Sequence, residues 1–133
     1  MSDRNIALVC AEGEGQKIEF KARASGLAKE MVAFANASGG SIFLGVADSG
    51  DVTGVADTNR LRSEIQNVAN GCDPRIPIRI IPHGPVIEVA VPEGEDKPYR
   101  CSEGFFLRLG PNSQQLTRDE ILKIAIRGGK VRF

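Results

Sequence analysis

The 133-residue chain has no tryptophan, one tyrosine and one histidine, and its basic and acidic side chains number 17 each. A formal charge of zero argues against a protein that binds nucleic acid by charge alone, because such proteins usually carry a basic excess. No apolar run approaches the roughly 20 residues that a membrane-spanning helix needs. The first fifteen residues lack a basic start followed by a long apolar stretch, so no signal peptide is predicted. These shortages favour a cytoplasmic protein with no membrane segment.

Cysteine and histidine are too few and too scattered for a zinc site. Cys10, Cys72 and Cys101 form no Cys-x-x-Cys pair, and His83 is the only histidine. We expect three reduced thiols, as is usual in the cytoplasm, and no cofactor that is required for folding. His83 lies between two prolines with no serine or cysteine signature nearby, which argues against nucleophilic catalysis.

The glycines do not form a nucleotide-binding loop. The chain contains no Gly-x4-Gly-Lys-Ser/Thr motif and no Gly-x-Gly-x-x-Gly between a strand and a helix. Gly39 and Gly40 follow a predicted helix and precede a predicted strand, whereas a phosphate is held where a helix begins. A tight helix-to-strand turn is therefore the better interpretation, and no ATPase motif is predicted in this chain.

Periodicity and turn signals predict an α+β domain with a mixed β-sheet and about three packed helices. The predicted helices cover residues 26–37 and 58–70 and a segment opened by the Thr-x-x-Glu capping box at Thr117. The predicted strands cover residues 17–21, 41–46, 52–55, 78–81, 86–91, 99–101 and 105–109. Residues before about 15 are expected to be irregular or partly helical. We expect a single domain over residues 1–133, with its core at about 14–126, as the N-terminal part of a longer protein.

Three carboxylates are spaced so that this fold can bring them together. Glu14 and Glu19 belong to the first predicted strand and its approach, and Asp48 follows the strand at 41–46. Clustered carboxylates repel one another unless a cation joins them, and Mg²⁺ or Mn²⁺ prefers all-oxygen ligands. One interpretation is a catalytic metal site that stabilises a phosphoryl transition state. The other is that Glu14 is solvated, Glu19 pairs with Lys21 or a nearby arginine, and Asp48 caps a turn.

Basic side chains form a second candidate surface. Lys17, Lys21 and Arg23 alternate along the first predicted strand and the residues after it, while Arg100 and Arg108 belong to two later strands. On strand faces these side chains can line one groove and contact phosphates. The alternative interpretation, a solvated surface of mixed charge, fits the same residues.

The ordered motifs of the chain resemble the Schlafen/AlbA-type domain, also called Schlafen AlbA_2. The matching segments are EGQKIEFK (14–21), AFANASGG (33–40), SIFLGVADSG (41–50) and FLRLGPNS (106–113). That domain occurs at the N-terminus of bacterial and archaeal proteins described as transcriptional regulators, RecG-related ATP-dependent helicases or divergent AAA-type ATPases, and in animal Schlafen proteins. The resemblance implies an α+β fold and a nucleic-acid-binding role, with DNA as the expected ligand and RNA as the alternative.

In some animal members the resemblance implies a metal-dependent RNase with three carboxylates, whose positions correspond here to Glu14, Glu19 and Asp48. Those nucleases hold structured RNA between two lobes, whereas this chain has one neutral lobe, which would hold RNA poorly unless it forms a homodimer. Three functions therefore stay open. They are nucleic-acid binding through Lys17, Lys21, Arg23, Arg100 and Arg108, a Mg²⁺- or Mn²⁺-dependent endoribonuclease, and a protein-interaction or oligomerisation domain.

Overall fold

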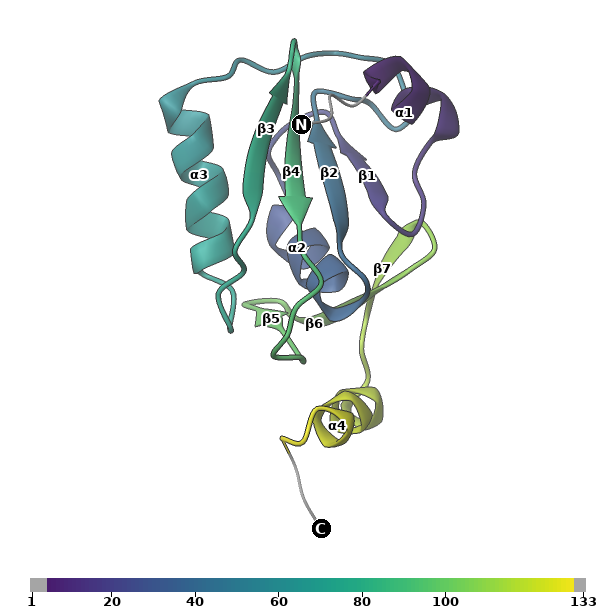
Figure 1. Ribbon diagram of the computed structural model, residues 1–133, viewed down its shortest axis with the longest axis vertical. Coiled ribbons are helices and arrows are strands. Elements are labelled where there is room, and N and C mark those ends of the chain that lie inside the picture. The colour runs from purple at the N-terminus through teal and green to yellow at the C-terminus, as the bar shows by residue number, and fades with distance from the viewer. Residues whose placement is uncertain (1–4, 131–133) are drawn as a thin grey trace.

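The computed structural model describes residues 5–130, which form four helices and seven strands in two small sheets (Figure 1). The elements in chain order are α1 (Ile6–Glu12), β1 (Ile18–Lys21), α2 (Leu27–Asn36), β2 (Gly40–Leu44), α3 (Asn59–Asn70), β3 (Arg79–His83), β4 (Val86–Val91), β5 (Arg100–Cys101), β6 (Gly104–Leu109), β7 (Asn112–Gln115) and α4 (Arg118–Arg127). The predicted α+β class is confirmed. Within the described residues no helix is long and apolar enough to cross a bilayer.

The larger sheet is mixed and has the strand order β1-β2-β4-β3. β1 and β2 are parallel, with Phe20 opposite Phe43, and α2 is the crossover between them. β4 pairs antiparallel with both β2 and β3. Because side chains alternate along a strand, Ile18 and Phe20 point to one face of β1 and Glu19 and Lys21 to the other, as predicted. β1 is an edge strand, which leaves its approach open to contacts from the second sheet.

α2 lies between the two sheets and is buried on almost every side. Eight of its ten residues are buried, because the larger sheet covers one side and the antiparallel β5-β6-β7 sheet covers the other. A helix that is enclosed in this way is expected to be apolar around most of its circumference. Glu30 and Asn36 are the two polar exceptions among its buried residues, and each connects α2 to the second sheet.

Asn36 makes the connection at the C-terminal end of α2. Its amide nitrogen donates to the carbonyl oxygens of Tyr99 (2.9 Å) and Phe106 (2.8 Å), and its amide oxygen accepts from the Tyr99 N–H (2.6 Å). One buried side chain therefore satisfies three backbone groups at the start of the second sheet, where an unpaired polar group would be costly.

Gly39 and Gly40 form the tight turn predicted after α2. A Cβ atom at Gly40 would lie 2.5 Å from the ring of Phe34 and 3.0 Å from the Lys17 carbonyl oxygen. Gly39 has φ +81°, and a Cβ there would lie 2.9 Å from backbone atoms of Val91 and Glu93. Both glycines are required by close packing of the backbone at the start of β2.

The opposite face of the larger sheet carries a second, smaller core. Val9 of α1 packs with Phe20, Phe43, Val46 and Val86, so α1 covers the upper part of this face in Figure 1. The sequence predicted only an irregular or partly helical segment before residue 15. The helix forms because Asn5 caps it, accepting a hydrogen bond from the Leu8 N–H at 3.1 Å, and because Val9 has an apolar surface to cover.

α4 projects from the rest of the molecule, at the bottom of Figure 1. The predicted capping box is present. Thr117 accepts from the Glu120 N–H, and the Glu120 carboxylate accepts from the Thr117 N–H. Ala125 is the only buried residue of this helix. α4 is therefore held by local interactions more than by packing.

Two predicted features differ from the structure. Residues 52–55 were expected to be a strand, but only a single bridge joins Val52 to Val46, because Gly50 and Gly54 adopt positive φ angles that interrupt extended pairing. No strand was predicted after residue 109, yet Asn112–Gln115 forms β7 by pairing with β6. Its polar side chains gave no apolar alternation from which a strand could be predicted.

Candidate functional site

The three predicted carboxylates line one polar pocket of about 370 Å³ at the end of β1. Glu14 and Glu19 come from the approach to β1 and from β1 itself, and Asp48 comes from the loop after β2. The parallel pairing of β1 with β2, which the sequence did not specify, brings their carboxyl ends to the same edge. Glu30 of α2 and Lys29 also line this pocket.

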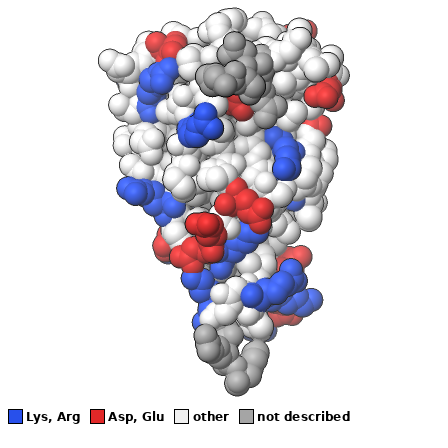
Figure 2. Space-filling model, in the orientation of Figure 1, with Lys and Arg blue, Asp and Glu red and all other residues white. Residues whose placement is uncertain are grey.

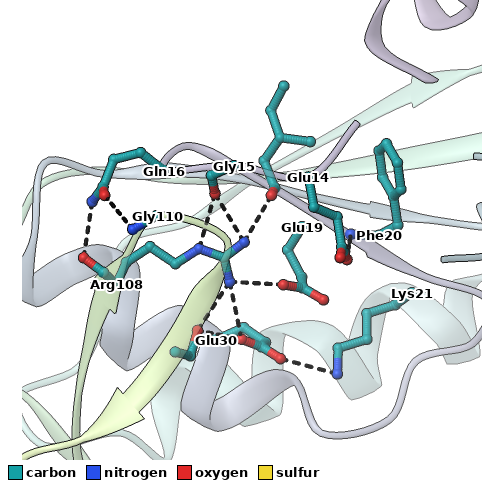
Figure 3. Close-up of polar contacts among 11 residues, drawn as sticks. Glu14, Gly15, Gln16, Glu19, Phe20, Lys21, Glu30, Arg108 and Gly110 are labelled. Atoms are coloured by element: carbon teal, nitrogen blue, oxygen red, sulfur yellow. Dashed lines mark hydrogen bonds and ion pairs between the residues drawn. The ribbon is translucent and has the colours of Figure 1, made fainter. Parts of the chain in front are cut away.

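Arg108 of β6 contacts side chains that line this pocket, and its own side chain is fully buried. Its Nη1 contacts Glu19 Oε1 at 2.7 Å and Ser113 Oγ at 3.0 Å, while Nη2 donates to the carbonyl oxygens of Gly15 (3.0 Å) and Ile18 (2.8 Å) (Figure 3). Its Nε donates to Gly15 as well, at 3.1 Å. Four of these five hydrogen bonds join the second sheet to β1 and the residues just before it, and the fifth, to Ser113, stays within the second sheet.

Glu30 supplies a second carboxylate to the same guanidinium. Arg108 Nη1 lies 3.5 Å from Glu30 Oε1, which also accepts a short hydrogen bond of 2.5 Å from Ser113 Oγ. The other oxygen of Glu30 pairs with Lys21 Nζ at 3.0 Å. The guanidinium also lies over the ring of Phe34. The ring centroid is 4.7 Å from the Arg108 Cζ, which is a favourable cation–π arrangement. We call Glu19, Lys21, Glu30, Arg108 and Ser113 the Arg108 cluster.

Glu19 has the most perturbed carboxyl group in this cluster. Burial and, to a smaller extent, a hydrogen bond with Glu14 raise the pKa of Glu19 against the lowering effect of the Arg108 hydrogen bond, and the net result is a pKa of about 7. The 2.7 Å contact with Arg108 alone would predict a lowered pKa. The upward direction prevails because one guanidinium is shared with Glu30, so its charge does not fully offset burial and two neighbouring carboxylates.

Glu14 and Asp48 differ from Glu19 in their surroundings. Glu14 is half-buried, and its Oε2 accepts a hydrogen bond of 3.0 Å from the Phe20 N–H, which fixes the turn into β1. Asp48 is exposed at the rim of the pocket. The expected alternative, in which Glu19 pairs with an arginine, corresponds to the observed contact with Arg108.

The side chains as placed do not assemble the predicted metal site. Among residues 5–130 no three His, Cys, Asp or Glu side chains are grouped closely enough to hold one ion. Glu14 and Glu19 are adjacent, but Arg108 and Lys21 already supply positive charge to the cluster. The binding of Mg²⁺ or Mn²⁺ by Glu14, Glu19 and Asp48 therefore stays a prediction.

The segments that build this site also identify the protein family of the chain. A model of the family described as Schlafen, AlbA_2 matches residues 14–117, which include all but the outer helices α1 and α4. The chain belongs to the Schlafen AlbA_2 family. Its Arg108 cluster and its carboxylate pocket both lie within the matched region.

The fold of this Schlafen AlbA_2 domain is similar to a crystal structure of the DIP2311 protein from Corynebacterium diphtheriae, with a TM-score of 0.60. The sequences are 20% identical, and the match covers 83% of this chain but only 27% of that one. The likeness shows the fold alone, and this chain spans about a quarter of the longer protein. No curated protein matches the chain.

The predicted basic residues of the Schlafen AlbA_2 domain fall into two groups. Lys17 and Arg23 are exposed, and neither forms an ion pair with another side chain in the described part of the chain. Arg100 is half exposed on β5 and lies 3.6 Å from Asp73. Lys21 and Arg108, in contrast, are engaged in the Arg108 cluster. On the face shown in Figure 2, basic and acidic side chains are interspersed, without a continuous basic surface.

Sequence reasoning missed Glu30, Ser113 and Lys29. Glu30 left a signal, because it falls within the apolar stripe formed by Leu27, Met31 and Phe34 of the predicted helix, where a carboxylate needs a buried partner. Ser113 and Lys29 left none, since their places in the site depend on how β7 and α2 pack beside β1.

Proposed function

We propose that this chain is a nucleic-acid-binding domain with DNA as its preferred ligand, in a bacterial transcriptional regulator or RecG-related helicase-like protein. The observation that carries the proposal is membership of the Schlafen AlbA_2 family, together with exposed basic side chains on both sides of edge strand β1. A zero net charge means that binding depends on where these charges lie rather than on their excess.

Lys17 and Arg23 are the contacts that the placement favours most. They flank β1, and an extended chain rises about 3.3 Å per residue, so their backbones are spaced to meet different phosphates. Each is exposed and has no ion-pair partner among residues 5–130. A phosphate would therefore interact with the full positive charge of each side chain, because no carboxylate has to be displaced first. Lys29, at the wall of the carboxylate pocket, adds a third candidate that the sequence did not single out.

The other predicted contacts are less available. Lys21 would have to leave Glu30, and Arg100 would have to leave Asp73, before either binds a phosphate. Arg108 is 1% exposed, so we do not include it among the proposed phosphate contacts. Its place in the proposal is to fix the position of β1, which carries Lys17 and Lys21.

The decisive experiment is a charge reversal at the two exposed positions. Lys17→Glu with Arg23→Glu should weaken binding to a short DNA duplex and make the slope of log K against log salt shallower by roughly 2, since each phosphate contact contributes about 0.9. Fluorescence anisotropy at several salt concentrations measures both quantities. Parallel titrations with single-stranded DNA and with RNA determine which nucleic acid binds best.

Arg75→Glu with Arg79→Glu is the matched control. Both arginines are exposed, the change in charge is the same, and β3 lies at the opposite edge of the sheet from β1. If both double variants lost the same affinity, the loss would follow from the change in net charge alone. That result would contradict a contact surface along β1.

A Mg²⁺- or Mn²⁺-dependent endoribonuclease is the second candidate function. The observation in its favour is that Glu14, Glu19 and Asp48 line one pocket, and the observation against it is that they do not converge on one ion position. Titration with Mn²⁺ while backbone amide signals are followed tests it directly. Broadening centred on these three residues, with RNA cleavage that Asp48→Ala abolishes, would support the enzyme. Cleavage that survives Asp48→Ala would exclude that site.

A protein-interaction or oligomerisation domain is the outcome if neither ligand is found. The absence of binding to DNA and to RNA at low salt would favour it over both other functions. Sedimentation analysis of the same sample would then determine whether the chain forms a homodimer.

A further inference from the structure

Cys72 and Cys101 face each other across a short antiparallel bridge between the end of α3 and β5. The bridge pairs Asp73 with Arg100, whose backbones exchange hydrogen bonds of 2.8 and 2.9 Å. In an antiparallel register the residue before Asp73 lies opposite the residue after Arg100. Cys72 and Cys101 are therefore a non-hydrogen-bonded cross-strand pair, a position in which Cα atoms are about 4.5 Å apart.

The surroundings of the two thiols suit a cross-link. Disulfide-bonded cysteines have Cα atoms about 4.4–6.8 Å apart, which includes the spacing of such a pair. Both cysteines are free and buried in the main core, with 5% and 4% of their surfaces exposed. Cys72 Sγ donates to the Val68 carbonyl at 3.4 Å and Cys101 Sγ to the Gly104 carbonyl at 3.6 Å. These are weak bonds, so little is lost when the thiol protons leave.

We propose that Cys72 and Cys101 are a site of oxidative modification, which a peroxide converts into an intramolecular disulfide. The thiolate of one cysteine attacks an oxygen of hydrogen peroxide, the O–O bond breaks, and the leaving hydroxide takes up a proton to become water. The resulting sulfenic acid is then attacked by the second sulfur, which loses its proton as the S–O bond breaks and a second water leaves. Two thiols lose two electrons, and the peroxide gains them.

Burial determines both the oxidant and the rate. Hydrogen peroxide is small and uncharged, so it can reach thiols that a bulky disulfide such as oxidised glutathione cannot approach. Burial, with a smaller contribution from Cys101, raises the pKa of Cys72 to about 11, so Cys72 is almost entirely protonated at neutral pH. Because the thiolate is the reacting species, closure is slow at pH 7 and accelerates as the pH rises.

The cross-link would join parts of the fold that local hydrogen bonds now hold together. It would connect the C-terminal end of α3 with β5 and enclose the β3–β4 hairpin in a covalent loop. Closing a loop of this length restricts the unfolded chain more than the folded one. The oxidised protein should therefore melt several degrees above the reduced protein, and reduction should reverse the increase.

The test begins with the unmodified chain. After treatment with hydrogen peroxide and blocking of remaining thiols, digestion without reduction should release a peptide pair linked through Cys72 and Cys101, two hydrogens lighter than the separate peptides. Dithiothreitol should separate the pair. If Cys72 and Cys101 are both still free, while Cys10 is oxidised or joins two chains, the proposal is overturned.

Cysteine variants provide the matched controls. Cys10 is half-buried on α1, so Cys10→Ala should retain both the linked peptides and the rise in melting temperature. Cys72→Ala and Cys101→Ala should each lose both, and the peptide that carries the remaining cysteine should gain the mass of added oxygen. A melting temperature that rises on oxidation in Cys72→Ala would contradict the proposal. The peptide map of the unmodified chain decides the question even if a variant does not fold.

Discussion

Arg108 is the residue on which the connection between the two sheets depends most. Its guanidinium reaches backbone carbonyls 90 and 93 positions earlier in the chain and two carboxylates on different elements. Removing one partner of a buried ion pair leaves uncompensated charge, which costs about 3–5 kcal/mol. We therefore expect Arg108→Ala to lower the free energy of unfolding by about that amount in urea titrations.

Arg118→Ala is the comparison for this change, since the Arg118 side chain is 88% exposed. Such a surface substitution should alter stability by less than about 0.5 kcal/mol. A loss at Arg108 no larger than at Arg118 would mean that the cluster contributes little to holding the sheets together.

The Glu19 carboxyl makes stability depend on pH in a definite direction. Its pKa is about 7 in the folded chain against an ordinary value of 4.5, so the folded state binds the proton more tightly. Its contribution to stability is therefore complete below about pH 4.5 and is lost as the pH rises to about 7. Glu19→Gln, which stays uncharged, should show a shallower decline in unfolding free energy across this interval. Glu103→Gln, at an exposed turn, should decline as the unmodified chain does.

At the scale of single elements, Asn36 determines how α2 meets the second sheet. Asn36→Ala would leave two buried carbonyls and one N–H without a partner, at a cost of about 3 kcal/mol. Asn67→Ala, on the exposed surface of α3, should be nearly neutral. Chemical denaturation of the two variants side by side would reveal the difference, and similar midpoints would argue that water replaces the lost amide.

Elements with a strong local pattern could be predicted from the sequence, and elements defined by their neighbours could not. The apolar spacing of Leu27, Met31 and Phe34 and the capping box at Thr117 place two helices correctly. β7 is polar and is a strand only because it pairs with β6. The sequence predicted that Glu14, Glu19 and Asp48 can come together, because two strands joined by one helix carry them, and all three line one pocket. The burial of Arg108 could not be predicted, since its partners lie so far away in sequence.

For the whole molecule, the helices outside the matched family region should contribute unequally to stability. Deleting residues 1–13 removes α1 and exposes Phe20, Phe43 and Val86, whereas deleting residues 118–133 removes a helix with one buried alanine. We expect the first deletion to lower the melting temperature by about 5 °C or more and the second to change it far less. Thermal denaturation of both shortened chains would check this order, and a larger effect of the C-terminal deletion would contradict the placement of α4.

The contact between Gly40 and the Phe34 ring has a consequence for how relatives should be sorted. The family motif AFANASGG ends in Gly39 and Gly40. A methyl group at either position would collide with the Phe34 ring or with neighbouring backbone atoms. A sequence search that uses AFANASGG therefore finds chains that share this fold. It gives no information about catalysis. Separating nucleases from binding domains would require a filter on other positions, such as the residues that face Arg108 and the rim at Asp48.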